Sequence, residues 1–227
     1  MLSTFTFVFV FITNGHLLYS LPLLVLYPKY KCLDDSITCD HHAYCEDKTK
    51  VQIDWDDEWS LHNWVQRFSL ECVEPYRIAM LGTLTFVGST LMGIFVTRLG
   101  DIYGRKIPTM ISSIMAVPIL ACILYSKNLY LTTILFFVMG SCGPGKTFVG
   151  FVYAGEMFPE KYRSIIGSIM LFTDSATMII LPLYFKFISK NWLYLQLFYF
   201  ILSFISSLCL FLIPESPKYL LSKGLYS

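Results

Sequence analysis

The sequence predicts an all-α integral membrane protein with six transmembrane helices. Hydrophobic residues make up 55% of its 227 residues and charged residues only 15%, a balance unlike that of soluble domains. Its apolar runs carry almost no charge, and each is near the roughly 20 residues that cross a bilayer as a helix. Basic residues gather in the turns between alternate runs. A soluble fold is therefore excluded.

The apolar runs divide the chain into a simple order. Residues 1–27 hold the first span, residues 28–77 form an extracellular loop with cysteines, and residues 78–227 hold spans two to six with their turns and a C-terminal P-E-S-P-K-Y-L segment. We expect the spans at Thr4–Leu26, Ile78–Thr97, Ile107–Ser126, Leu129–Gly155, Ser164–Phe185 and Trp192–Ile213.

The distribution of basic residues predicts the orientation. The turns after spans two, four and six carry Arg98, Arg105, Lys106, Lys161, Arg163, Lys218 and Lys223. The short turns on the opposite side carry only Lys127, Lys186 and Lys190. Because basic residues favour the cytosolic side, we expect both termini in the cytosol, the long loop outside and a plasma-membrane location.

The long loop contains four cysteines, which are Cys32, Cys39, Cys45 and Cys72. Such a cluster predicts two disulfides and an oxidising compartment, with three possible pairings left open. A metal site at Cys39, His41, His42 and Cys45 is the weaker alternative, because two adjacent histidines do not easily reach one ion. We therefore expect no metal and no cofactor. The absence of any basic run of five or more residues argues against nucleic-acid binding.

Two polar groups interrupt the apolar spans. Asn14, Gly15 and His16 lie mid-way along the first span, where they should face protein or a wet cavity, either bonding a neighbouring helix or contacting a substrate. Lys146 lies near the centre of the fourth span, where an ammonium needs a polar cavity or a partner. We expect it to be a cavity charge that binds a substrate group or exchanges partners during a transport cycle. The structural alternative is a permanent pair with a carboxylate such as Asp174, the one acidic residue well inside another span.

The segment around Lys146 also matches a nucleotide-binding pattern. Residues 140–147 read G-S-C-G-P-G-K-T, which fits G-x-x-x-x-G-K-[ST]. A phosphate loop needs a preceding strand and water around the nucleotide, whereas this segment lies inside an apolar run. We interpret the match as coincidence. Gly143, Pro144 and Gly145 should instead break or kink the helix and free backbone groups for a cavity.

The turn after the second span carries the first family resemblance. Residues 97–106 read T-R-L-G-D-I-Y-G-R-K, in which Asp101 and Arg105 are spaced to pair on a helical turn. Gly104 permits a backbone conformation closed to other residues. The stretch resembles the G-x-L-A-D-R-x-G-R-K loop of the major facilitator superfamily, although Thr97 replaces its first glycine and Ile102 replaces its arginine.

Two further segments resemble the same superfamily. Residues 156–167, E-M-F-P-E-K-Y-R-S-I-I-G, are similar to the E-x-x-P-x-x-x-R-x-x-x-G signature of sugar porters and organic ion transporters, and could bring Glu156 and Arg163 together. Residues 214–224, P-E-S-P-K-Y-L-L-S-K-G, look like their P-E-S-P-R-[WY]-L signature. The long loop with cysteines favours the organic cation, anion and carnitine transporter branch over the sugar porters.

The resemblance implies the N-terminal half of a twelve-helix major facilitator fold, whose two halves rock about a central site. It implies a carrier of small organic ions, not an enzyme, whose partners are a small-molecule solute, the lipid bilayer and a second six-helix half. The alternatives are a sugar-porter-like carrier and a non-transporting membrane binding protein. We expect the chain to be a fragment or a half, and expect that six helices alone do not transport.

The resemblance also implies the roles of individual residues. The gating and charge network would comprise Asp101, Arg105, Lys106, Glu156, Arg163 and Glu215. The substrate cavity would be contacted by Lys146, Asp174, Asn14 and His16.

Overall fold

A computed structural model describes residues 2–32, 38–39, 44–45 and 50–224. Six helical segments are long and apolar enough to cross a membrane. They comprise α1 (Leu2–Leu24), α4 (Pro75–Tyr103), α5 (Lys106–Tyr125), α6 to α7 (Leu129–Met157), α8 (Glu160–Phe187) and α9 (Trp192–Leu212), with a short α10 (Pro217–Ser222) after them. The six predicted spans are confirmed.

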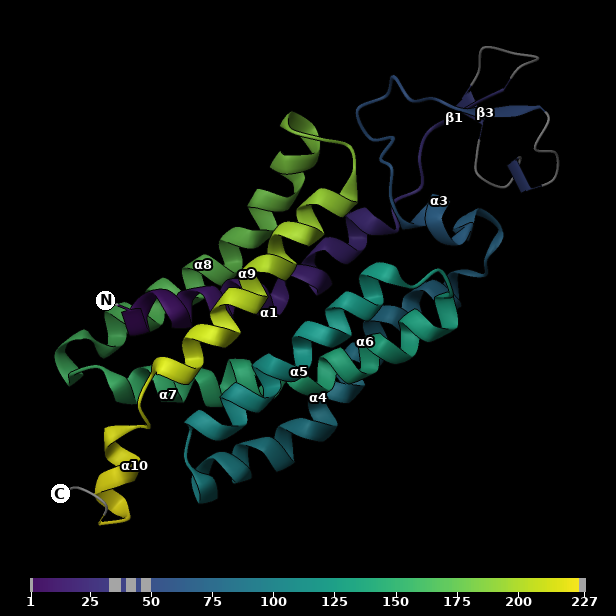
Figure 1. Ribbon diagram of the computed structural model, residues 1–227. Coiled ribbons are helices and arrows are strands. Elements are labelled where there is room, and N and C mark those ends of the chain that lie inside the picture. Colours follow the sequence, from purple (N-terminus) through teal and green to yellow (C-terminus); the bar gives the residue numbers. More distant parts are fainter. Residues whose placement is uncertain (1, 33–37, 40–43, 46–49, 225–227) are drawn as a thin grey trace.

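The helices form one bundle in which sequence neighbours are not always spatial neighbours. Helix α4 packs mainly on α6, α1 packs on α8 and α9, and α5 packs on α6 and α9. The start of α1 and the end of α10 lie at one end of this bundle, and the described residues between α1 and α4 lie at the other (Figure 1).

The second span is longer than the sequence predicts. Helix α4 continues through Thr97 to Tyr103, so only Gly104 and Arg105 separate it from α5. The helix ends at Gly104, which has a φ of 96°, a conformation that favours glycine. A Cβ atom there would also lie 2.5 Å from the Glu215 carboxylate. The predicted ten-residue turn is therefore mostly helix.

The fourth span changes its winding where Gly143, Pro144 and Gly145 occur. Helix α6 ends at Pro144, a π-helical segment η2 covers Gly145–Val149, and α7 (Gly150–Met157) continues it. Pro144 has no N–H to donate within the helix. The backbone N–H of Gly150 donates to the carbonyl of Gly145, five residues back. The expected irregularity is thus a wider turn and not a break.

The loop after α1 has secondary structure that the sequence does not predict. Three short strands, β1 (Tyr30–Cys32), β2 (Thr38–Cys39) and β3 (Val51–Ile53), form an antiparallel sheet in the order β2-β1-β3. A one-turn helix α3 (Trp64–Phe68) and a 3₁₀ turn (Leu70–Cys72) follow. Trp64 is fully buried and packs edge-to-face on Phe136 and Trp192. This contact fixes the loop to one end of the bundle.

Two glycines allow α4 and α6 to touch backbone to backbone. A Cβ atom at Gly140 would lie 2.1 Å from the carbonyl oxygen of Thr85, and one at Gly88 would lie 2.3 Å from that of Phe137. No side chain fits in either contact, since real Cβ atoms do not approach so closely. Small residues are the usual means of such close packing between membrane helices.

Replacing Gly140 with alanine is expected to destabilise the bundle. The added methyl group would force α4 and α6 apart, at a cost of about 1–3 kcal/mol for an overpacked contact. The thermal unfolding midpoint of the purified chain in detergent measures the change. Gly82→Ala is the matched control in α4, because its Cβ would lie 3.7 Å from Leu21, an ordinary contact. Equal midpoints for the two variants would contradict the proposed backbone contact.

Candidate functional site

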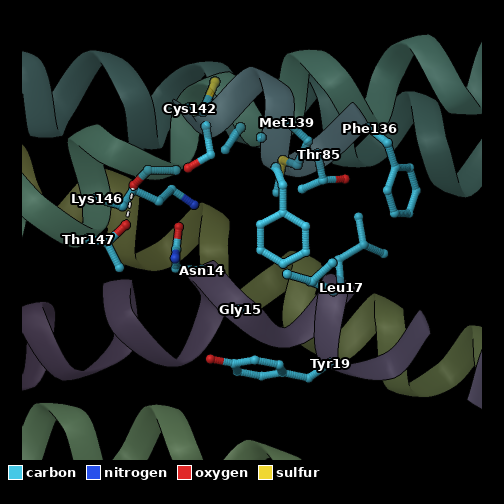
Figure 2. Close-up of a pocket in the computed structure, with 16 residues that line it drawn as sticks. Asn14, Gly15, Leu17, Tyr19, Thr85, Phe136, Met139, Cys142, Lys146 and Thr147 are labelled. Carbon is cyan, nitrogen blue, oxygen red and sulfur yellow. Dashed lines mark hydrogen bonds between the residues drawn. The ribbon is translucent and has the colours of Figure 1, made fainter. Parts of the chain in front are cut away.

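A pocket lies within the bundle between α1, α4, α6 and η2. Its polar and charged lining includes Asn14, Thr85, Ser89, Lys146 and Thr147. Its apolar lining includes Leu17, Phe86, Phe136 and Met139. Figure 2 shows Asn14 and Leu17 of α1 facing Lys146 and Met139, whereas the Tyr19 ring lies on the other side of α1. The close contact of α4 with α6 therefore builds one wall of the pocket.

Lys146 is the single charged side chain among the described residues that line the pocket. It is only 2% exposed, and its Nζ atom finds no hydrogen-bond partner among the described residues. The side chains of Lys146 and Asn14 point toward each other (Figure 2). The neighbouring Thr147 hydroxyl is already committed, because it donates to the carbonyl of Gly143 at 2.6 Å. An ammonium at this depth is costly unless a partner or a polar cavity accompanies it.

The π-helical turn explains how Lys146 reaches the pocket. Gly145, the residue before it, packs against α5 so closely that a Cβ atom would lie 1.9 Å from the Ser112 hydroxyl. The wider turn then inserts one extra residue per turn at this contact, which changes the direction of the side chains that follow. Turns of this kind are frequent at functional sites.

The other two predicted cavity residues, Asp174 and His16, do not line this pocket. Asp174 accepts a hydrogen bond from the Tyr19 hydroxyl at 2.8 Å, between α8 and α1, and is not among the residues that line the pocket. The permanent Lys146–Asp174 pair considered above is thus not formed. His16 is buried against α9, where its ring stacks on Tyr199 and its Nδ1 lies 2.9 Å from the carbonyl of Thr13. Of the four predicted cavity residues, the structure brings together Lys146 and Asn14.

The segment that matches the phosphate-loop pattern is helical throughout. Residues 140–147 run from α6 into η2, with no strand before them and with Gly140 against α4. The amide groups of such a segment bond within the helix and are not free to surround a phosphate. The structure therefore supports interpreting this match as coincidence.

A second polar cluster joins the α4–α5 junction to the segment between α9 and α10. The Glu215 carboxylate accepts hydrogen bonds from the backbone N–H groups of Arg105 and Lys106, both at 3.0 Å, and of Ser216 at 2.9 Å. The start of α5 thereby gains an acceptor for N–H groups that have no partner in the helix. Tyr219 adds a hydrogen bond from its hydroxyl to the carbonyl of Ile102.

Arg105 connects this cluster to α7. Its guanidinium lies 2.6 Å from Asp101, the spacing that the sequence predicts, and its Nε atom lies 3.9 Å from the Glu156 carboxylate. Glu156 also accepts a hydrogen bond from Ser216 at 2.5 Å. The serine was not singled out from the sequence, although it lies within the P-E-S-P segment. Four of the six predicted network residues, Asp101, Arg105, Glu156 and Glu215, thus join one connected cluster through their side chains.

The side chains of the remaining two network residues, Arg163 and Lys106, make different contacts. The Nε of Arg163 donates to the carbonyl of Gly155 at 2.8 Å, so the expected approach of Glu156 and Arg163 is replaced by the approach of Glu156 and Arg105. Lys106 joins the cluster through its backbone N–H, while its ammonium donates to the carbonyl of Phe211 at 3.1 Å.

The loop contains a disulfide between Cys45 and Cys72, and Cys32 is disulfide-bonded too. His41 and His42 of the alternative metal site lie outside the described residues. Lys31 lies 2.8 Å from Asp54 and holds the pKa of that carboxyl below its ordinary value. This ion pair therefore stabilises the loop at neutral pH, and the stabilisation is lost as the pH falls through the lowered pKa.

Arg67 anchors the same loop to the bundle. Its guanidinium donates to the carbonyls of Leu124 at 2.6 Å and Ser126 at 2.9 Å, at the C-terminal end of α5, where a positive charge is favoured. It also lies 5.0 Å from the ring centre of Trp192 at the start of α9. Partial burial lowers the pKa of this guanidinium.

Six membrane-spanning helices, a pocket inside the bundle and a charge cluster at one end define a polytopic membrane protein of the transporter class. The sequence pattern of the Major Facilitator Superfamily matches residues 4–224, which is nearly the whole chain. The chain belongs to this superfamily, whose members are transporters and not enzymes.

Curated relatives point to one branch of the superfamily. The chain is 28% identical over 174 residues to organic cation/carnitine transporter 2 of Mus musculus, covering 75% of this chain and 31% of the relative. It is 30% identical over 164 residues to solute carrier family 22 member 16 of Mus musculus, covering 71% and 25%. It is 24% identical over 191 residues to solute carrier family 22 member 3 of Rattus norvegicus, covering 82% and 34%. The chain thus spans about a quarter to a third of the length of these relatives.

Removing the Glu215 carboxylate is expected to loosen the cluster between α5 and α10. Glu215→Ala leaves three backbone N–H groups without their acceptor, which should lower the free energy of unfolding by about 1–3 kcal/mol. Glu215→Gln keeps one acceptor oxygen and should lower it less. Thermal unfolding in detergent measures both, with Glu160→Ala on the exposed first turn of α8 as the control. A midpoint for Glu215→Ala equal to that of the control would refute this role.

Proposed function

We propose that this chain acts as one half of a carrier that moves small organic ions across a membrane by alternating access. The observation that carries the proposal is Lys146, a buried ammonium without a partner among the described residues, in a pocket between membrane-spanning helices. An intramembrane ionisable group of this kind is typical of a substrate pathway. The names of the relatives, organic cation/carnitine transporters among them, support organic ions over sugars.

Alternating access needs a second body against which this bundle moves. Helices α4 and α8 are well suited to face it, because few residues in their apolar windows are buried, 17% and 22% respectively. The chain also covers only part of the length of its relatives. We propose that a second six-helix half supplies the opposite wall of the pocket.

In this proposal the polar cluster around Glu215 is the inner gate. The α4–α5 junction and the segment between α9 and α10, which carry this cluster, lie at the end of the bundle where α1 begins (Figure 1). Asp101, Arg105, Glu156 and Glu215 would hold this end closed while the pocket opens to the other side, and would separate when the bundle rocks. Because these contacts are polar and partly solvated, they can be broken at a small cost compared with an apolar core contact.

The transport proposal predicts that uptake requires two halves. Proteoliposomes would hold either the 227-residue chain or the full product of its gene, and would be offered tetraethylammonium, carnitine, benzoate and glucose. We expect saturable uptake of at least one organic ion, and none of glucose, by a preparation with twelve spans. The chain alone is expected to give none. Glucose uptake would favour the sugar-porter alternative, and no uptake in either preparation would contradict a carrier function.

The orientation is a second prediction of this proposal. We propose that the Glu215 cluster and both ends of the chain lie in the cytosol and the disulfide-containing loop lies outside, in the plasma membrane, as the distribution of basic residues favours. A membrane-impermeant maleimide should label Asp56→Cys in intact cells, and Lys161→Cys only after permeabilisation. The unsubstituted chain controls for its natural cysteines. Labelling of Lys161→Cys in intact cells would reverse the orientation.

A further inference from the structure

A polar groove opens at the end of the bundle that carries the loop, where α3, the turn between α5 and α6, and the start of α9 meet. Its volume is about 690 Å³. The basic and amide side chains that line it include Arg67, Lys127, Gln66 and Asn191, and no aspartate or glutamate occurs among its described lining residues. The groove therefore presents hydrogen-bond donors and positive charge without a counter-charge.

The guanidinium of Arg67 is held in one orientation beside this groove. Its Nε and Nη2 atoms donate to the carbonyls of Ser126 and Leu124, and the ring centre of Trp192 lies 5.0 Å away. These two bonds leave other N–H groups of the same guanidinium free to donate to a ligand. Because the side chain is already fixed, binding a ligand there costs little additional side-chain entropy.

Three further side chains offer donors to the same groove. Lys127 is exposed and has no hydrogen-bond or ion-pair partner among the described residues. The Gln66 Oε1 atom pairs with the Nδ1 of His62 at 3.1 Å, and the Asn191 Oδ1 atom accepts from a backbone N–H in the first turn of α9 at 2.9 Å. Each amide thus uses its oxygen within the protein, and its NH₂ group is the part left for a ligand.

The donors suit an oxyanion, and the place of the groove indicates which kind. Helix α5 ends at Tyr125 and α9 begins at Trp192, so the groove lies where two spans end. Tyr125 and Tyr194 are exposed there, as tyrosines commonly are at the level of lipid headgroups. The next exposed side chains along α9, Leu197 and Phe198, are apolar. Lipid chains would cover this apolar surface, whereas a free anion would leave it bare.

We propose that this groove binds the headgroup of an anionic phospholipid. The phosphate diester lies between Arg67 and Lys127, the NH₂ groups of Gln66 and Asn191 reach other headgroup oxygens, and the chains lie along the exposed faces of α5 and α9. A zwitterionic headgroup would bring a cation beside the same basic residues, which is unfavourable. The bound lipid connects the loop to α5 and α9, whatever solute the bundle carries.

Probes that share either the chains or the phosphate test the class of ligand. The purified 227-residue chain in detergent is titrated with dioleoylphosphatidylglycerol, dioleoylphosphatidylcholine, dioleoylglycerol, inorganic phosphate and sialyllactose, an acidic glycan. Native mass spectrometry and the shift in the unfolding midpoint measure binding. Phosphatidylglycerol is expected to bind about tenfold more tightly than phosphatidylcholine, because two basic residues face its headgroup. The three probes that lack either phosphate or chains are expected to bind more weakly than both lipids.

Variants of Lys127 assign the preference to the groove. Lys127→Gln should weaken the binding of phosphatidylglycerol about fivefold, as the loss of one basic residue beside an anionic lipid allows. Lys127→Glu should abolish the preference over phosphatidylcholine. Lys186→Gln is the matched control, because it removes the same charge near the loop but lies outside the groove. Arg67 is left unsubstituted, since its bonds to carbonyls hold the loop to the bundle.

The position of the bound lipid is a second measurement, which still decides if Lys127→Glu does not fold. A phosphatidylglycerol with a photoactivatable headgroup should cross-link to the peptide that contains Tyr125 and Lys127. Equal binding of the two phospholipids, a preference that survives Lys127→Glu, or cross-links confined to the opposite end of the bundle would overturn the inference. Inorganic phosphate or sialyllactose binding as tightly as phosphatidylglycerol would instead indicate a site for soluble anions and would also overturn it.

Discussion

The backbone contact between α4 and α6 is the constraint on which the pocket depends. Gly88 and Gly140 let the two helices approach until each glycine lies against a carbonyl of the other helix. Within a bilayer, helices gain little by burying apolar side chains, so close packing of this kind is what holds them together. Thr85 and Ser89 on one helix and Met139 and Gly143 on the other then form a single continuous wall. A larger residue at either glycine would push the two helices apart and so change the shape of that wall.

The two ends of the bundle are held by different physical means. At the loop end, Trp64 is buried among aromatic rings and Arg67 binds carbonyls at the end of α5, so the contact combines apolar burial with fixed hydrogen bonds. At the opposite end, Glu215 and Arg105 hold the helix junctions through charged groups that remain partly exposed. The first kind of contact resists separation, and the second can be exchanged for water. The contacts at the Glu215 end are therefore the easier ones to separate.

The sequence predicts the spans well and the tertiary contacts less well. Apolar runs near the thickness of a bilayer leave little choice but helix, and the Asp101–Arg105 pair follows from spacing on a single helix. The partner of Arg163 is not predictable from the sequence. The carbonyl of Gly155 and the carboxylate of Glu156 belong to adjacent residues, so spacing does not show which of them Arg163 contacts. The anchoring role of Arg67 gave no signal either, since its partners lie more than fifty residues away.

The pocket shows the same division between local and distant information. Lys146 stands out in the sequence because a charge within an apolar span is costly, and that reasoning is independent of the fold. His16 and Asp174 stand out for the same reason, yet they satisfy part of their bonding with Thr13 and Tyr19 on their own or adjacent helices. The position of a polar residue along its span shows that it needs a partner. The rotation of its helix about its axis decides whether its side chain lines the pocket. The π turn at Gly145–Val149 determines that rotation for Lys146, and its sequence, G-P-G-K, indicated an irregularity without its direction.

A buried ammonium without a counter-ion among the described residues also bears on how a carrier could couple binding to movement. A ligand shifts a conformational equilibrium only by the difference in its interaction with the two states. If a bound ligand supplies the partner that Lys146 lacks among the described residues, the loaded pocket can close at a much smaller electrostatic cost than the empty one, because closure removes the water that would otherwise solvate the charge. The unpaired charge would then make closure depend on loading. A permanent internal partner such as Asp174 would remove that dependence, which gives a physical reason for the two charges to lie on different sides of α1.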